Sequence, residues 1–427
     1  MNVLVSAYAC NPARGGEEGI GFNWMHEWHH TGHAVWCLTT PAGRPALDAY
    51  VDHLGSEGQA RMHFEYVQVP KVIDYLYRWQ FGVYLHYIVW QFLAWRTAQR
   101  LTKQVNFDLV HHASYGSLQM ASWLWRLGRP MVIGPLGGGQ HAPAAFKRYV
   151  PDWFKTETLR NAIAWLLTTF DPNVRKSLQH ATLVLTTNTE TATKVKQLGG
   201  QRVQMFVDSG LPDNFLPEQF PVRAEGEVLR ILWLGRLVTR KALPLVLEAL
   251  GQVNPRVPFH LTIVGDGYLG PQLPDLIRHY GLEGRVTWTG TLPWLEVREM
   301  YLTHDVFMFA SLRDSFAMQL LEAMGAGLPI ITLDHQGARD FIPTAAALKA
   351  PVTTPAETVA ALAHAVEVCY DNPAQRVAMG RVGYAFACTQ TWYLRSLRLQ
   401  QLLTDLSPTV APSQPGVVAR QASYSRL

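Results

Sequence analysis

The chain alternates short apolar runs with longer amphipathic segments from its first residues to about residue 406. A short apolar run bounded by turn residues predicts a buried strand, and strands that alternate with helices predict parallel α/β sheets. In the first half we predict strands at 2–7, 34–40, 63–70, 108–114, 130–136, 181–187 and 202–207. In the second half we predict strands at 229–235, 258–264, 285–289, 305–310, 329–333 and 347–349.

A length of 427 residues exceeds what one hydrophobic core normally supports and fits two domains of about 200 residues each. Proline and charged residues interrupt the pattern between Ser209 and Glu227, which indicates a linker. We therefore predict a first domain at 1–212, a linker at 213–228, a second domain at 229–388, a last helix at 389–406 and a disordered, Pro- and Ser-rich tail at 407–427.

Bulk composition excludes several classes of protein. The net charge of +4 is small and dispersed, so we expect no nucleic-acid partner. The cysteines show neither paired nor metal-ligand spacing, which is typical of a reducing cytoplasm. The segment Met1–Ala7 leads directly into a strand without a basic region, so we expect no signal peptide and a cytoplasmic location.

The segment 311–329 places two carboxylates, Asp314 and Glu322, eight residues apart across a loop and the first two turns of a predicted helix. Ser315 is the predicted N-cap of this helix. The free N–H groups and the dipole at a helix N-terminus favour an anion. A ligand with hydroxyls at both ends and phosphates between them fits, as a nucleotide sugar does. The alternative is an ordinary acid at a helix start followed by an exposed helix acid.

This segment resembles the Glu-x7-Glu motif of retaining glycosyltransferases of the GT4 family, with Asp314 in place of the first Glu. The resemblance implies the GT-B fold, in which two doubly wound Rossmann-like domains face each other across a cleft. It also implies that the last helix packs back on the first domain. It assigns Asp314 to the donor sugar, together with the backbone of Phe316 and Ala317, and Glu322 to the ribose hydroxyls.

A second segment, 229–243, reads as a strand, a glycine turn at Gly235 and a helix that begins near Lys241. The resemblance places Arg236 and Lys241 on the donor diphosphate. Breaking the anomeric C–O bond leaves charge on phosphate oxygens, which fixed cations stabilise without a metal. We expect Lys241→Ala to abolish turnover and to leave the fold intact.

The first strand runs into a glycine loop with Gly15 and Gly16, flanked by Arg14 and Glu17. Glycines let backbone N–H groups approach a phosphate, and relatives have a loop here that borders the donor phosphates. The alternative is an ordinary strand-to-helix turn. A later glycine run, 137–139, is followed by Gln140 and His141. Either side chain is a candidate to hydrogen-bond sugar hydroxyls, and a flexible turn is the alternative.

The fourth predicted strand ends with His111 and His112. Relatives often carry a strand-end histidine that contacts the sugar, but in their usual spacing the position is Ala113 here. Successive strand residues face opposite sides, so only one of the two faces the substrate. His112 is the first candidate and His111 the second, and we expect a buried, hydrogen-bonded structural role for the other.

The stretch 79–95 has no charged side chain and is rich in aromatic residues. It is too short and too polar to span a membrane, but together with its flanks, 73–97, it suits a helix on a membrane surface. A buried helix that packs on the first sheet is the alternative.

We therefore predict a retaining, metal-independent glycosyltransferase that moves a sugar from a nucleotide diphosphate donor to a hydroxyl acceptor. The resemblance places it in polysaccharide, exopolysaccharide or glycolipid biosynthesis, with a glycan or lipid-linked acceptor and no cofactor beyond the donor. It works in the cytoplasm, with peripheral contact to the inner face of the membrane as a further hypothesis. Two alternatives are a nucleotide-sugar epimerase of the same fold and a non-catalytic subunit that binds nucleotides or glycans.

Overall fold

The computed structural model describes residues 1–76, 82–224 and 226–406. The predicted tail at 407–427 and part of the aromatic stretch, 77–81, lie outside the described residues. The chain forms two compact units. Unit 1 comprises Met1–Gly139, Ile163–Ser209 and the chain from Trp392 onward, and unit 2 comprises Gln140–Ala162 and Gly210–Thr391.

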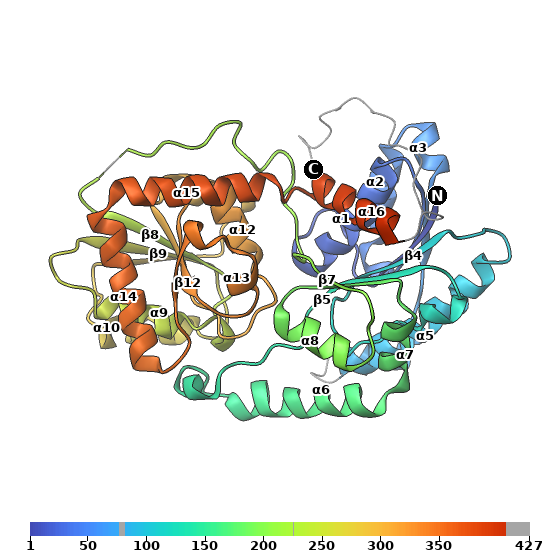
Figure 1. Cartoon of the computed structure of the whole chain (residues 1–427), viewed down its shortest axis with the longest axis horizontal. Coiled ribbons are helices and arrows are strands. Elements are labelled where there is room, and N and C mark those ends of the chain that lie inside the picture. Colours follow the sequence, from blue (N-terminus) through green and yellow to red (C-terminus); the bar gives the residue numbers. More distant parts are fainter. Residues whose placement is uncertain (77–81, 225, 407–427) are drawn as a thin grey trace. The chain divides into compact units, whose positions relative to one another are not determined.

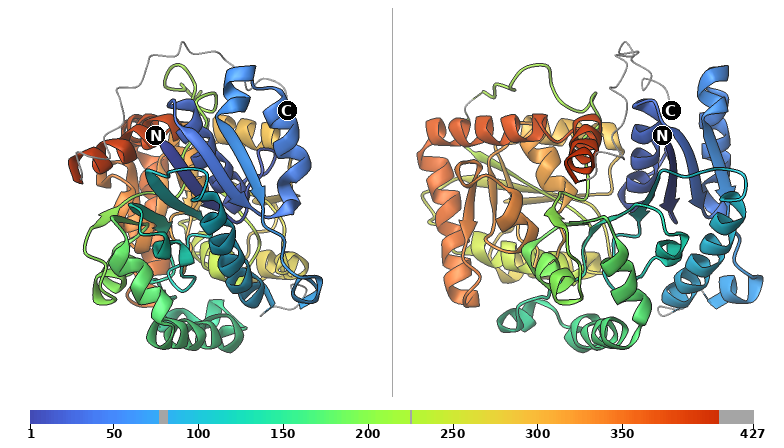
Figure 2. Two further views of the ribbon diagram at one scale, coloured as in Figure 1. Left: turned by 90° about the vertical axis from the view of Figure 1, so that its right-hand side faces the viewer. Right: turned by 45° about the vertical axis from the view of Figure 1, so that its right-hand side comes forward.

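The described part of unit 1 contains one sheet of seven parallel strands (Figure 1). In chain order they are β1 (Asn2–Ala7), β2 (Ala34–Thr39), β3 (Met62–Tyr66), β4 (Leu109–Ser114), β5 (Met131–Leu136), β6 (Leu183–Thr186) and β7 (Val203–Met205). Their spatial order is β3-β2-β1-β4-β5-β6-β7. Figure 2 shows β1, β2 and β3 as neighbouring blue arrows.

The described part of unit 2 contains a second sheet of six parallel strands. These are β8 (Leu229–Leu234), β9 (Phe259–Val264), β10 (Val286–Gly290), β11 (Val306–Phe309), β12 (Ile330–Leu333) and β13 (Ala347–Ala350). Their order is β10-β9-β8-β11-β12-β13. In each sheet the order reverses beside the first strand, between β1 and β4 and between β8 and β11. Such switch points are where doubly wound sheets bind ligands, at the carboxyl ends of the strands.

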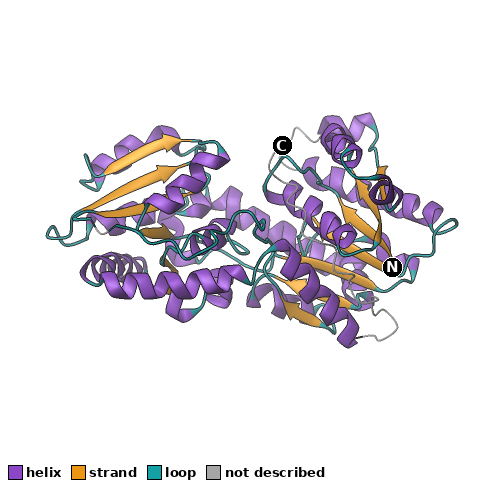
Figure 3. Cartoon of the chain, turned by 90° about the horizontal axis from the view of Figure 1, so that it is seen from above, coloured by secondary structure: helices purple, strands orange, loops and turns teal. Residues whose placement is uncertain are grey.

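Helices connect the strands of each unit and lie against the sheets (Figure 3). In unit 1 they are α1 (Gly16–His30), α2 (Arg44–Asp52), α3 (Ser56–Ala60), α4 (Lys71–Leu76), α5 (Gly82–Leu101), α7 (Pro172–His180), α8 (Thr189–Gln197) and α16 (Trp392–Leu406). In unit 2 they are α9 (Leu243–Gly251), α10 (Leu273–His279), α11 (Trp294–Thr303), α12 (Met318–Gly325), α13 (Gln336–Phe341), α14 (Pro355–Asp371) and α15 (Pro373–Cys388). Helix α6 (Leu159–Phe170) begins in the unit 2 segment and continues into unit 1.

Strand β1 shows how the sheet of unit 1 separates two cores. Successive strand side chains face opposite sides, so Val3 and Val5 join the core under α1 and α16, whereas Leu4 joins the core under α5. On the first side, the Trp24 and Trp392 rings pack edge to face at 5.7 Å. The last helix, α16, therefore contributes its apolar face to unit 1, although α15 belongs to unit 2.

The predicted α/β class with two doubly wound sheets is confirmed, and every predicted strand is present. The largest difference is at Val67–Pro70, which we predicted as strand but which follows β3 as irregular backbone. Proline has no N–H for a sheet hydrogen bond, so the strand stops earlier. None of the helices in the described ranges has the length and apolar character that crossing a bilayer requires.

Candidate functional site

The loop after β8 carries the predicted diphosphate-binding residues. Gly235 is buried at the strand end, and Arg236 is exposed. A short 3₁₀ turn follows at Thr239–Lys241. The predicted helix start near Lys241 is confirmed, because α9 begins at Leu243, directly after Ala242, which has a left-handed φ of 47°.

Lys241 is 5% exposed and forms an ion pair with Asp314 through Nζ and Oδ2. Arg240, the preceding residue, contacts the other oxygen of the same carboxylate at 3.4 Å. Burial alone would raise the pKa of Asp314, but the two cations outweigh it and hold the pKa below its usual range. The Lys241 ammonium also lies 4.7 Å over the Phe309 ring. The predicted pair Lys241 and Asp314 thus meets at the β8–β11 switch point as one charged cluster.

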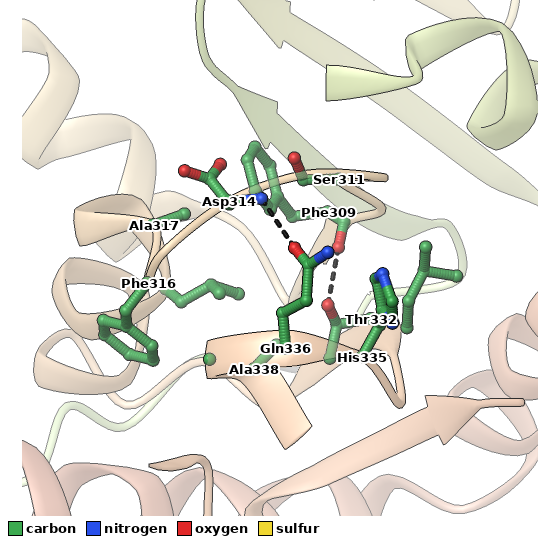
Figure 4. Close-up of a pocket in the computed structure, with 12 residues that line it drawn as sticks. Phe309, Ser311, Asp314, Phe316, Ala317, Thr332, His335, Gln336 and Ala338 are labelled. Carbon is green, nitrogen blue, oxygen red and sulfur yellow. Dashed lines mark hydrogen bonds between the residues drawn. The ribbon is translucent and has the colours of Figure 1, made fainter. Parts of the chain in front are cut away.

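Buried polar contacts fix the backbone around Asp314 (Figure 4). The Asp314 N–H donates to Oε1 of Gln336 at 2.8 Å, and Nε2 of Gln336 donates to the His141 carbonyl at 2.9 Å. Gln336 is 2% exposed and has a left-handed φ of 50°. A Cβ on the next residue, Gly337, would lie 1.8 Å from the Ser315 carbonyl oxygen, so only glycine fits.

A small pocket lies at the start of α12, between the loop after β11 and the start of α13 (Figure 4). Phe316 and Ala317 line it, and its volume of about 20 Å³ holds about one water molecule. The N-cap of α12 is Ala317, so the prediction of Ser315 as N-cap is wrong. The Ser315 hydroxyl instead accepts a hydrogen bond from Gln140 at 3.1 Å. The pocket therefore lies beside the start of α12 and is lined by Ser311 and Asp314 as well as by apolar side chains.

Glu322 lies one turn into α12 rather than two, because the helix starts later than predicted. Glu322 is 9% exposed, and its Oε2 accepts a hydrogen bond from the buried Tyr301 hydroxyl at 2.7 Å. Burial raises the pKa of Glu322 above its usual value, and the bond from Tyr301 opposes this rise. The alternative of an exposed helix acid is thus wrong, because this carboxyl group is buried and held by a specific donor.

The glycine loop of unit 1 lies at the β1–β4 switch point. Gly15 precedes α1, and Gly16 has a left-handed φ of 64° that favours glycine. Both are exposed, and a Cβ on either would meet no atom within 4 Å. Arg14 and Glu17 are exposed beside them, with Arg14 paired to Glu18 at 3.2 Å. The start of α1 is open, as an anion site requires.

His111 lies in the core of unit 1 and is not at a binding surface. It is fully buried, its Nδ1 accepts a hydrogen bond from the Trp28 indole at 3.0 Å, and its Nε2 bonds the Gly134 carbonyl at 3.0 Å. Burial lowers the pKa of His111 to about 4, so the ring is neutral. The prediction of a catalytic role for His111 therefore has no support in its position.

His112 points to the opposite side of the sheet, as strand alternation requires. It is 1% exposed, and its ring nitrogens bond the Tyr87 and Ser6 hydroxyls at 3.1 and 3.2 Å. Burial lowers the pKa of His112 to about 3. Both histidine rings fill and cross-link the core of unit 1, and the contact of His112 with a sugar stays a prediction.

The glycine run at 137–139 also serves packing. A Cβ on Gly138 would lie 2.5 Å from the Gln119 side chain, and one on Gly139 would lie 2.6 Å from the Thr191 backbone. Gly138 therefore leaves room for the Gln119 side chain, and Gly139 lets its backbone approach that of Thr191. Packing alone favours glycine at these two positions.

Three residues of the unit 2 cluster were not predicted. Arg240 had a signal, because it adjoins Lys241 in the same basic loop. Tyr301 and Gln336 had no such signal. Tyr301 donates to the Glu322 carboxylate and Gln336 accepts from the Asp314 backbone N–H, and only tertiary packing brings these separate segments together.

Comparison with known proteins identifies the part of the chain that carries this cluster. Residues 217–386 match the family model described as glycosyl transferases group 1. The chain is 32% identical over 136 residues to the amylovoran biosynthesis glycosyltransferase AmsK of Erwinia amylovora, covering 30% of this chain and 33% of AmsK. The chain spans less than half the length of the curated relatives it matches.

Solved structures share the fold over nearly the whole chain. Sucrose-phosphate synthase from Thermosynechococcus elongatus superposes with a TM-score of 0.65 at 16% identity, covering 95% of this chain and 98% of the synthase. HepE of Anabaena in complex with UDP superposes with a TM-score of 0.60 at 17% identity, covering 95% of this chain and 100% of HepE. At such identities the likeness shows the fold alone.

Proposed function

We propose that this chain transfers a sugar from a nucleotide diphosphate donor to a hydroxyl acceptor, because residues 217–386 match the model of glycosyl transferases group 1 and the chain has the GT-B fold. The observation that carries this proposal is the cluster of Arg240, Lys241 and Asp314 beside the start of α12. AmsK acts in biosynthesis of a polysaccharide, and HepE is solved with UDP. A polysaccharide, exopolysaccharide or glycolipid pathway and a UDP-type donor follow as parts of the proposal.

In this proposal each residue of the cluster contacts a different part of the donor. Lys241 and the exposed Arg236 neutralise the diphosphate as the bond from the anomeric carbon to its oxygen breaks. Asp314 and the N–H groups at the start of α12 hold the sugar, and Glu322 holds the ribose hydroxyls. With these cations in place, we propose that the transfer needs no metal ion and no cofactor beyond the donor.

We propose retention of configuration at the anomeric carbon. Asp314 is paired with two cations, which makes its carboxylate a poor nucleophile, so a covalent glycosyl intermediate is disfavoured. The acceptor hydroxyl then attacks from the face that the phosphate leaves. The new C–O bond forms as the C–O bond to phosphate breaks, and the acceptor proton passes to the leaving phosphate oxygen.

The first experiment is a thermal-shift and product screen against UDP-, GDP- and ADP-sugars, with and without chelator. We expect one donor to raise the Tm of the protein, with slow release of free sugar. Neither result should change when chelator is added. Conversion of the donor sugar to its epimer without acceptor would identify an epimerase instead. Failure of every nucleotide to bind would contradict the proposal and favour a non-catalytic subunit.

We further propose that unit 1 contacts an anionic membrane surface through α5. One face of α5 packs in the core, while Leu85, Ile88 and Phe92 form an exposed stripe at spacings of three and four residues. Arg96 and Arg100 continue the exposed face and line an open groove with Phe92. Apolar side chains followed by cations are what a helix lying at an anionic lipid surface requires.

Vesicle sedimentation tests the contact with the membrane. Full-length protein is expected to bind vesicles with about 30% phosphatidylserine and to release at high salt, because screening weakens attraction between exposed charges. Ile88→Ser combined with Phe92→Ser should abolish binding, whereas Leu295→Ser, an equally apolar and 69% exposed position on α11, should not. Equal binding by all three proteins would refute a role for α5.

A further inference from the structure

The last turn and a half of α1 reads His26-Glu27-Trp28-His29-His30. His-Glu-x-x-His on a helix places the first and last histidines on one face, one turn apart, which is the spacing of many zinc sites. The sequence predictions covered no metal ligand here.

The side chains of His26, Glu27 and His30 converge in the structure. The two imidazole rings stack with centroids 5.6 Å apart and planes 27° apart. Nδ1 of His30 lies 3.5 Å from Oε2 of Glu27, and one ligand atom from each of the three residues lies within 4.8 Å of the other two. We propose that His26, Glu27 and His30 bind a zinc ion.

The donor set fits the chemistry of zinc. Two imidazole nitrogens and one carboxylate oxygen, with water in the fourth position, form one of the usual zinc coordination sets. Tetrahedral bonds of about 2.0–2.1 Å place ligand atoms about 3.4 Å apart. The contact between Glu27 and His30, at 3.5 Å, already has this separation, and the other ligand atoms lie within 4.8 Å of each other.

The surroundings of His26 support the same assignment. Its Nδ1 bonds the Tyr50 hydroxyl at 2.6 Å, and a zinc ion on Nε2 would leave this orienting bond intact. His29 is not part of the set, because its Nε2 bonds the Gly58 carbonyl at 3.1 Å.

The position of this site separates it from the proposed sugar transfer. His26 lies ten residues after Gly16, or about 15 Å along α1 from the glycine loop. The His30 ring lies 5.6 Å from the Tyr393 ring of α16, so the ion would sit where α1 meets the last helix. Zinc at this place would stabilise the packing of α16 on unit 1.

The test uses tag-free, full-length protein that has been stripped with chelator and desalted. Titration of ZnCl₂ against a chromophoric competitor is expected to give one zinc per chain with a dissociation constant in the micromolar range or tighter. Zinc should raise Tm, because it binds the folded chain in preference to the unfolded one. His30→Gln is expected to weaken binding at least tenfold, and Glu27→Gln should do the same.

The chain offers a matched control on α14. His364 and Glu367 lie 3.6 Å apart, but the positions one turn either side of this histidine are Ala360 and Val368. His364→Gln should therefore leave zinc affinity unchanged. Equal binding by wild type and His30→Gln, or no binding below about 100 µM zinc, would overturn the proposal. Should the variants fail to fold, cobalt-loaded wild type decides: a tetrahedral spectrum supports the site and an octahedral one contradicts it.

Discussion

Asp314 and Glu322 come from the same short segment, yet the structure gives their carboxyl groups opposite environments. Asp314 lies in the loop before α12 between two cations, Lys241 and Arg240, and its pKa is lowered. Glu322 lies inside α12, bonded to the neutral Tyr301 hydroxyl, and burial raises its pKa. The first carboxylate is held by charge and the second by a hydrogen bond.

The comparison shows two ways in which a protein sets the ionisation of a buried carboxylate. Opposite charges favour the ionised form of a partly buried carboxylate, whereas a neutral donor only partly offsets the cost of burying one. In the proposed reaction the ionised group belongs beside the diphosphate cations and the sugar. The group with a raised pKa lies further into the helix, where a ribose with its own hydroxyl donors would complete its hydrogen bonds.

The largest effect is expected for Lys241→Met. Loss of a fixed cation at the leaving group should lower kcat about 10²–10³-fold, measured with the donor that the screen identifies. The variant should also lose about 1–3 kcal/mol of stability, because Asp314 loses its closest cation and keeps the longer contact to Arg240. The sequence-based expectation of an intact fold therefore changes to one of lower stability.

A double variant distinguishes these two effects. Lys241→Met with Asp314→Asn removes both charges and should recover most of the lost Tm, but none of the lost turnover. Recovery of turnover in the double variant would contradict the assignment of Lys241 to the diphosphate.

Tyr301→Phe comes next in size and tests the second carboxylate. Tyr301 is fully buried, so the change leaves Glu322 without its donor and should cost about 1–3 kcal/mol in urea unfolding. A double-mutant cycle tests the pair. Tyr301→Phe should lower the free energy of unfolding by less in the Glu322→Gln background than in wild type. Strict additivity would show that the hydrogen bond contributes nothing to stability.

The pH dependence of Tm should differ in sign between the two carboxylates. The lowered pKa of Asp314 adds stability above about pH 4, the unfolded value, and this stability is lost as the pH falls through the folded pKa. Glu322 has a raised pKa, so its contribution is most favourable below about pH 4 and is lost as the pH rises.

Thermal unfolding of Asp314→Asn and Glu322→Gln between about pH 3 and pH 8 measures this contrast. The Tm of Asp314→Asn should lie furthest below the wild-type Tm near neutral pH and should approach it at acid pH. The Tm of Glu322→Gln should rise relative to the wild-type Tm as the pH increases from about 4. Parallel curves for both variants would mean that the two environments do not differ as described.

The smallest effect on stability is expected for Arg236→Ala. Arg236 is exposed, so unfolding should change by less than about 0.5 kcal/mol while affinity for the nucleotide diphosphate falls. Arg256→Ala is the control, because Arg256 is also exposed and pairs with Asp371 on the surface. Equal nucleotide affinity in both variants would remove Arg236 from the proposed site.

The sequence alone determined the secondary structure and the chemistry of the cluster. Strands, turns and helices depend on local pattern, so the two sheets, the position of Lys241 just before a helix and that of Asp314 after a strand could be predicted. The left-handed φ of Ala242 was not predicted, and the start of α12 was missed by a few residues, since Ala317 replaces Ser315 as N-cap. Neither choice has a local sequence signal.

Only the tertiary structure decided which polar side chains are buried in the core and which can contact a ligand. His111 and His112 looked like strand-end candidates, but the packing of α1 and α5 on the two faces of the sheet buries both rings. Gln336, which accepts from the Asp314 N–H, and Tyr301, which donates to the Glu322 carboxylate, come from segments that pattern does not connect with these acids. Burial and the charge of spatial neighbours set a pKa, and both depend on the whole fold rather than on adjacent residues.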